Sequence, residues 1–158
     1  MRFLTFFLFL PLIGFAQVAK PPLLELSGGV FEIVRHNRHM TGEFVIEYKF
    51  SCEWYTIRPI VGFMVTCKNS TYLYTGLAFD WILGGHLLLS PDFAAGWYSP
   101  NGGKNLGFPL EFRSGINLGW VFNSGYRVGS HFYHISNASL GHKNPGEESL
   151  DLFLAIPF

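Results

Sequence analysis

Three residues near the end of the chain, His134, Ser136 and Glu148, have the side-chain types of a nucleophilic triad. A serine hydroxyl is too weak an acid to attack an ester unaided, so a neighbouring imidazole must accept its proton. A carboxylate beside the other imidazole nitrogen fixes the tautomer and stabilises the imidazolium that forms. The chemistry that this set predicts is acyl transfer through a covalent serine intermediate.

The residues around this set supply other groups that acyl transfer requires. A tetrahedral intermediate needs hydrogen-bond donors for its oxyanion. Asn137 and Asn144 flank the predicted site, and the loop between them carries backbone N–H groups. The remaining histidines show no metal-ligand spacing. The histidine spacing therefore indicates no metal site.

The elements that must position these residues are β-strands. From Leu110 to Phe122 the even positions are apolar or serine, whereas the odd positions include Glu111, Arg113 and Asn117. Such alternation over more than ten residues indicates a strand with two different faces. Strands in soluble proteins average about five or six residues, whereas strands of about ten residues suit a tilted crossing of a bilayer.

Period-two alternation recurs along the chain and predicts strands at about 25–36, 42–52, 57–67, 70–84, 86–98, 109–122, 126–138 and 148–158. An even number of antiparallel strands that closes on itself leaves no sheet edge, as a hydrocarbon environment requires. The predicted fold is all-β, an eight-stranded antiparallel transmembrane β-barrel. Eight strands make a small barrel whose interior is filled by side chains.

Composition favours a membrane barrel over a soluble one. Charged residues make up 14% of the chain, whereas soluble proteins have about 25%. In a barrel that spans a membrane, the apolar face of each strand meets lipid and the charged and glycine-rich face points inward. A soluble ligand-binding barrel would reverse these faces, and this alternative stays open. The net charge is zero, so no basic surface indicates binding to nucleic acid.

The first segment of the chain has the pattern of a targeting signal. Arg2 is followed by an almost wholly apolar run to Phe15 and then by Ala16. This pattern is typical of a secretory signal peptide, and the run is too short to span a membrane as a helix. We expect cleavage near Ala16, which gives a signal peptide at 1–16 and a barrel at 17–158.

The two cysteines, Cys52 and Cys67, lie near opposite ends of the third predicted strand. At about 3.3 Å per residue they are separated by tens of ångströms. A disulfide requires Cα atoms within about 7 Å. We therefore expect no bond between them, and the sequence suggests no role for either.

Face assignment places the three triad residues together on the hairpin at 126–158. The even positions of the last strand, Leu150 to Phe158, face lipid, and Glu148 belongs to the same set. An antiparallel pairing with either His134 or Ser136 opposite Glu148 keeps all three on one face, within about 5–7 Å. Polar groups at strand ends also cost little near the interface. The pattern alone thus leaves open both a catalytic site and a set of rim residues.

The stretch from His134 to Phe158 resembles the C-terminal end of the lipid A 3-O-deacylase (PagL-type) family of outer-membrane acyl hydrolases. The residues that match the pattern of the family are His134, Ser136, Asn137, Ala138, Asn144, Gly146, Glu148 and Ser149. The resemblance covers about 25 residues of the chain. One departure is Ser139, where some relatives are expected to have Gly, and it bears on the loop conformation.

The resemblance implies an eight-stranded barrel with a Ser-His-Glu triad on its outer surface. In it Ser136 is the nucleophile, His134 the base and Glu148 its orienter, while Asn144 and the backbone near Asn137 and Ala138 help to form the oxyanion hole. The implied activity is a serine esterase, a hydrolase that removes the ester-linked 3-hydroxyacyl chain at the 3-position of lipid A, without a cofactor.

The implied location is the bacterial outer membrane, with the site near the outer leaflet and lipopolysaccharide as the substrate. A non-enzymatic barrel that serves structure or adhesion is the alternative. The acyl-chain length preference, the regulation and the oligomeric state, a homodimer included, are left open.

Overall fold

The computed structural model describes residues 20–34, 39–51 and 56–158. The signal peptide predicted at 1–16 lies outside the described residues, as does Cys52, whereas Cys67 is an exposed, free cysteine. The strands of the described part are β1 (Leu23–Phe31), β2 (Thr41–Lys49), β3 (Ile57–Thr66), β4 (Thr71–Phe79), β5 (Trp81–Leu83), β6 (Leu87–Ser99), β7 (Leu110–Val121), β8 (Arg127–Ser136) and β9 (Glu147–Pro157).

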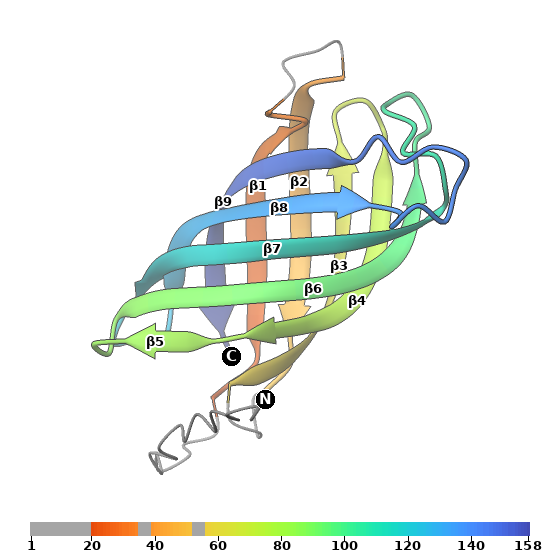
Figure 1. The fold of residues 1–158 in the computed structure, drawn as a ribbon. Coiled ribbons are helices and arrows are strands. Elements are labelled where there is room, and N and C mark those ends of the chain that lie inside the picture. The colour runs from red at the N-terminus through yellow and green to blue at the C-terminus, as the bar shows by residue number, and fades with distance from the viewer. Residues whose placement is uncertain (1–19, 35–38, 52–55) are drawn as a thin grey trace, which may run out of the picture.

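The strands form one closed antiparallel sheet (Figure 1). β1 pairs with both β2 and β9, and β4 closes the barrel by pairing with β3 and β6. β4 and β5 share a single register against β6, with Ala78 opposite Asp92 and Trp81 opposite Leu89. They are one strand interrupted at Asp80, as the segment 70–84 predicted. Counted in this way, the predicted eight-stranded barrel is confirmed.

The first strand is the one whose bounds differ most from the prediction. It was expected at 25–36 and is observed at Leu23–Phe31. Glu32 has a φ of 62°, which lies in the left-handed region and takes the chain out of the extended conformation. Residues 32–34 are therefore not strand, although the Ile33 N–H still donates to the Glu148 carbonyl at 2.8 Å, and the predicted residues 35–36 lie outside the described part.

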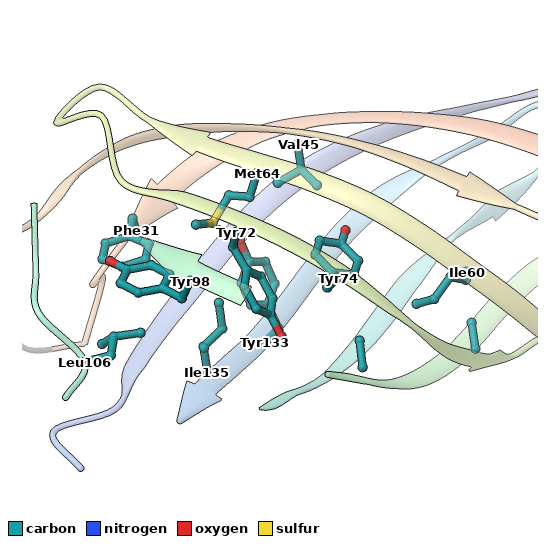
Figure 2. Packing of buried hydrophobic residues seen from close by; sticks show 12 residues of the cluster. Phe31, Val45, Ile60, Met64, Tyr72, Tyr74, Tyr98, Leu106, Tyr133 and Ile135 are labelled. Carbon is teal, nitrogen blue, oxygen red and sulfur yellow. Dashed lines mark hydrogen bonds between the residues drawn. The ribbon is translucent and has the colours of Figure 1, made fainter. Parts of the chain in front are cut away.

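The two faces of the barrel wall follow the predicted assignment. Outward-pointing side chains are apolar and exposed, such as Leu73 at 58% and Leu152 at 72%. Figure 2 shows the aromatic part of the interior, where Phe31, Tyr72, Tyr98 and Tyr133 gather. In the described residues, no helix is long and apolar enough to cross a membrane.

Charged side chains occupy much of the remaining interior, and several of them form ion pairs. Asp80 receives hydrogen bonds from Arg58 at 2.7 Å and from Arg127 at 2.6 Å. Nearer the middle, Arg113 donates to Asp92 at 3.0 Å and to Glu47 at 2.8 Å. Buried charges persist only when they are paired and hydrogen-bonded. These ion pairs connect strands across the interior and so hold the barrel wall that carries the outward-facing residues.

The two ends of the barrel differ in the connections that they carry. The start of β1 lies beside the end of β9, where Leu23 is opposite Pro157. At the other end the β6–β7 and β8–β9 connections lie close together (Figure 1). His134, Ser136 and Glu148 are at this second end, at the end of β8 and the start of β9.

Candidate active site

Strand register brings His134 and Glu148 together. They are directly opposite each other in the β8–β9 ladder, and His134 Nδ1 lies 3.2 Å from Glu148 Oε1. Of the two pairings that the sequence allowed, the structure has the one with His134 opposite Glu148. The side chains are 39% and 18% exposed, so both are partly open to the surroundings of the barrel. A carboxylate here accepts the Nδ1 hydrogen and leaves the Nε2 lone pair as the base.

The neighbouring acid, Glu147, points the other way. Its side chain is fully buried, and its Oε2 accepts hydrogen bonds from the Ser149 hydroxyl at 3.1 Å and from the Glu32 N–H at 3.4 Å. Successive residues of a strand face opposite sides of the sheet. Glu148, and not Glu147, therefore shares the outer face with His134, as the alternation predicted.

Ser136 is the last residue of β8 and is half-buried on the same outer face. Within the described part of the chain, its hydroxyl and the His134 ring form no hydrogen bond. Residues two apart on a strand have Cα atoms about 7 Å apart, so rotation of the two side chains must close the contact. Hydrogen bonds of this kind are often long before a substrate binds.

Gly146 lies directly against the His134 ring. A Cβ added at Gly146 would lie 2.7 Å from His134 Cε1 and 3.3 Å from Nε2, and its φ of 58° is in the left-handed region. A side chain at this position would strain the backbone and also push the imidazole away. Gly146 is one of the residues that match the family pattern, and this contact gives the physical reason for a glycine.

We expect Gly146→Ala to lower kcat by about 10–100-fold if His134 is the base, because a displacement of a catalytic group by about 1 Å has an effect of that size. Gly84→Ala is the matched control. Its φ is 57°, nearly the same, but nothing lies within 4 Å of an added Cβ. The control carries the same backbone strain without the contact and should retain activity. Equal losses in the two variants would assign the effect to strain alone. The measurement is steady-state kinetics on the purified, folded barrel.

The loop after Ser136 begins with a strained turn. Ala138 and Ser139 have φ values of 50° and 65°, and the Leu140 N–H donates to the Asn137 carbonyl at 2.9 Å. Two positive φ values in succession are the pattern of a type I′ turn, which favours Gly or Asn. A non-glycine residue in this region costs about 1–2 kcal/mol. The Gly expected at position 139 in some relatives would remove that cost.

Asn137 and Asn144 tie the loop together. The Asn137 N–H donates to Asn144 Oδ1 at 3.0 Å, and the buried Asn137 amide donates to the carbonyls of Leu106 and Lys143 at 2.8 and 3.0 Å. The N–H of Asn137, a candidate oxyanion donor, is thus engaged by Asn144 in this structure. An oxyanion role for Asn137, Ala138 and Asn144 stays a prediction.

A groove of about 320 Å³ runs along the outer surface beside Ser136 and is lined by Phe93, Phe112, Arg113, Ser114, Ser136 and Ala138. The rings of Phe93 and Phe112 are stacked with centroids 6.1 Å apart. Sequence reasoning did not single out these two residues, because every outward-facing apolar residue of a barrel has the same signature. Their proximity to Ser136 depends on strand register, since Phe112 is opposite Ser136 in the β7–β8 ladder.

No group of three His, Cys, Asp or Glu side chains in the described residues has an arrangement that could hold a metal ion. The candidate site lies on the β8–β9 hairpin and the adjoining wall. This arrangement can bind an apolar chain along the groove and present a hydroxyl, an imidazole and a carboxylate at its end.

A family model described as lipid A 3-O-deacylase (PagL) matches residues 36–157, most of the 158-residue chain. Among curated proteins, the lipid A deacylase PagL of Pseudomonas aeruginosa is 45% identical over 56 residues. That alignment covers 35% of this chain and 32% of the relative. The match thus spans about a third of the length of that protein.

Solved structures match the fold over nearly the whole barrel. The crystal structure of the outer membrane enzyme PagL has a TM-score of 0.63 at 23% identity and covers 86% of this chain and 99% of that one. Neisserial surface protein A also gives 0.63, at 9% identity, with 90% and 100% covered. At such identities the structures establish the architecture only. The family model, which extends over most of the described barrel, shows that the chain belongs to the lipid A 3-O-deacylase (PagL) family.

Proposed function

We propose that this outer-membrane β-barrel is a serine esterase that removes the ester-linked 3-hydroxyacyl chain at the 3-position of lipid A. Membership of the deacylase family supports the reaction and the substrate class. The observation that carries the proposal is the His134–Glu148 contact of 3.2 Å on the outer face of the wall, beside Ser136 and its groove. A site that opens toward lipid suits a substrate that is itself part of the membrane.

The groove gives the acyl chain a place to bind. Phe93 and Phe112 present apolar ring faces along it, and Ser136 and Ala138 lie among its lining residues. An acyl chain that lies along the two rings would place its ester carbonyl near the Ser136 hydroxyl. In lipid such a chain gains little from leaving one apolar environment for another, so the groove acts chiefly by orientation.

The reaction begins when His134 Nε2 accepts the proton of the Ser136 hydroxyl as Oγ attacks the ester carbonyl. Glu148 holds the Nδ1 hydrogen and stabilises the imidazolium. The tetrahedral intermediate collapses as its bond to the sugar oxygen breaks, and His134 returns the proton to that oxygen. Water, activated by His134, then hydrolyses the acyl-serine and releases the 3-hydroxy fatty acid. The proton count balances without a cofactor.

The position of the site supports access to lipopolysaccharide. β1 begins and β9 ends at the end of the barrel opposite the candidate site. If that end faces the periplasm, as is usual for outer-membrane barrels with short periplasmic turns, the site lies at the outer leaflet. Lipopolysaccharide occupies this leaflet, so its ester-linked chains are within reach of an outward-facing serine.

Mass spectrometry of lipid A from cells that express the chain tests the proposal. The expected result is the loss of one hydroxyacyl chain relative to cells with an empty vector. The sugar fragments should locate the loss at the 3-position. Heat-modifiable migration on a gel shows that the barrel has folded. Unchanged lipid A from cells with folded barrel would contradict the proposal and favour a non-enzymatic barrel.

A further inference from the structure

A buried ion pair joins two loops at the end of the barrel that carries the candidate site. Lys104, in the β6–β7 loop, pairs with Glu32, which follows β1, and the side chains are only 7% and 0% exposed. Neither residue belongs to the family motif at the end of the chain. Burying a lysine and a glutamate has a desolvation cost of several kcal/mol for each ion, so the location of this pair calls for an explanation.

The pair and its neighbours hold three consecutive residues, Gly146 to Glu148. Lys104 Nζ donates to the carbonyl of Gly146. The N–H of Glu32 donates to the Glu147 carboxylate at 3.4 Å, and the N–H of Ile33 donates to the Glu148 carbonyl at 2.8 Å. The main chain is thus held from the interior side while the Glu148 side chain points outward.

Both groups that this segment presents to the outer face belong to the proposed site. Gly146 supports the His134 ring, since an added Cβ would approach Cε1 to 2.7 Å. Glu148 contacts Nδ1 of the same ring at 3.2 Å. A shift of the Gly146–Glu148 backbone would therefore move both the glycine that lies against the imidazole and the carboxylate that is its hydrogen-bond partner.

The strained backbone conformation of Glu32 is a second observation that links this ion pair to the candidate site. Its φ of 62° is unusual for a residue other than glycine, and such conformations cost about 1–3 kcal/mol and cluster at functional sites. The conformation aims the N–H of Glu32 at Glu147 and its carboxylate at Lys104. Surrounding contacts must hold it in place, and the ion pair with Lys104 is one of them.

We propose that the Lys104–Glu32 ion pair positions the imidazole and carboxylate of the site by holding the Gly146–Glu148 backbone. Lys104 and Glu32 are positioning residues, because their contacts are with the loop and with the start of β9. The inference rests on the proposed function for its consequence in catalysis. Its structural part, the orientation of the His134 ring, can be measured without any activity.

The test compares the same substitution at two buried lysines of the full chain, purified as a folded barrel in detergent micelles. Lys104→Met removes the positioning pair. Lys49→Met removes a second buried Lys–Glu pair, in which Lys49 Nζ lies 2.8 Å from Glu25, at the opposite end of the barrel. Lys49 Nζ also lies 3.5 Å from Glu47, so Lys49→Met removes at least as many buried ionic contacts as Lys104→Met, and a general loss of stability affects both.

In kinetic measurements we expect Lys104→Met to lower kcat by about 10–100-fold, the effect of a displacement of about 1 Å, with little change in KM. Lys49→Met should keep a kcat close to that of the unmodified chain. Lys104→Arg restores the charge and the donors and should recover much of the loss. In a Glu148→Gln background, Lys104→Met should have no further effect, because groups that act as a unit are not additive.

The second readout is the ¹⁵N NMR spectrum of the His134 ring, assigned by the loss of its signals in His134→Gln. The unmodified chain and Lys49→Met should show hydrogen on Nδ1, and Lys104→Met should shift population to the Nε2–H tautomer. Should Lys104→Met not fold, Glu32→Gln carries the same expectations. An inactive, folded parent chain would overturn the proposed esterase while the NMR comparison still tests the ion pair. An active parent with normal kcat and an unchanged ring signal in Lys104→Met would overturn this inference alone.

Discussion

Ser136→Ala is expected to abolish deacylation while leaving the barrel intact. The substitution removes the hydroxyl that would form the acyl intermediate, and loss of the nucleophile of a triad lowers kcat by about 10⁶-fold in a well-studied serine hydrolase. Ser136 is half-buried on the outer face, and among the residues that the structure describes its hydroxyl donates no hydrogen bond. The change should therefore affect the reaction and not the fold. The measurement is release of 3-hydroxy fatty acid from purified lipid A.

Two controls separate a lost nucleophile from a damaged site. Ser114→Ala removes another outward-facing hydroxyl that lines the same groove, next to Phe112, and should change kcat by less than about tenfold, since the residue has no role in the triad. The double variant Ser136→Ala with His134→Ala should be no worse than Ser136→Ala alone, because the two residues act as a unit. A Ser136→Ala barrel that retains more than a hundredth of the activity would rule out Ser136 as the nucleophile.

The barrel could be predicted from the alternation of apolar and polar residues, because this one repeated pattern identifies its strands. In a wall one residue thick, each side chain faces either lipid or the interior. Leu150, Leu152 and Leu154 therefore had to be outward if Asp151 was inward. The same rule separated Glu148 from Glu147 without any knowledge of the register. The first strand was predicted to end too late, because the left-handed backbone conformation of Glu32, a residue other than glycine, leaves no signal in the sequence.

The supporting parts of the site could not be predicted in this way. Lys104 and Glu32 are far apart in the chain, and they meet only because β1 pairs with β9 and the β6–β7 loop folds against the β8–β9 loop. Phe93 and Phe112 resemble other lipid-facing aromatic residues until the register places Phe112 opposite Ser136. Loop contacts and cross-strand neighbours depend on closure of the whole barrel, and periodicity within one strand carries no information about them.

Replacement of the two adjacent glutamates at the start of β9 is expected to give very different results. In Glu148→Gln the amide keeps the shape of the side chain but can donate a hydrogen bond to His134 Nδ1. The ring would then carry its hydrogen on Nε2, which faces the serine, and could not act as the base. The corresponding change of a triad carboxylate to an amide lowers kcat by about 10⁴-fold.

Glu147→Gln is the matched comparison, because it makes the same chemical change one residue away on the inner face. The amide oxygen of the substituted side chain can still accept hydrogen bonds from the Ser149 hydroxyl and the Glu32 N–H, which lie 3.1 and 3.4 Å from the carboxylate. We expect a loss of less than about tenfold, since the acceptor of both bonds is retained. Kinetics of the two folded variants on the same lipid A preparation decide the assignment. A larger loss from Glu147→Gln than from Glu148→Gln would transfer the role to the inner glutamate and contradict an outward-facing triad.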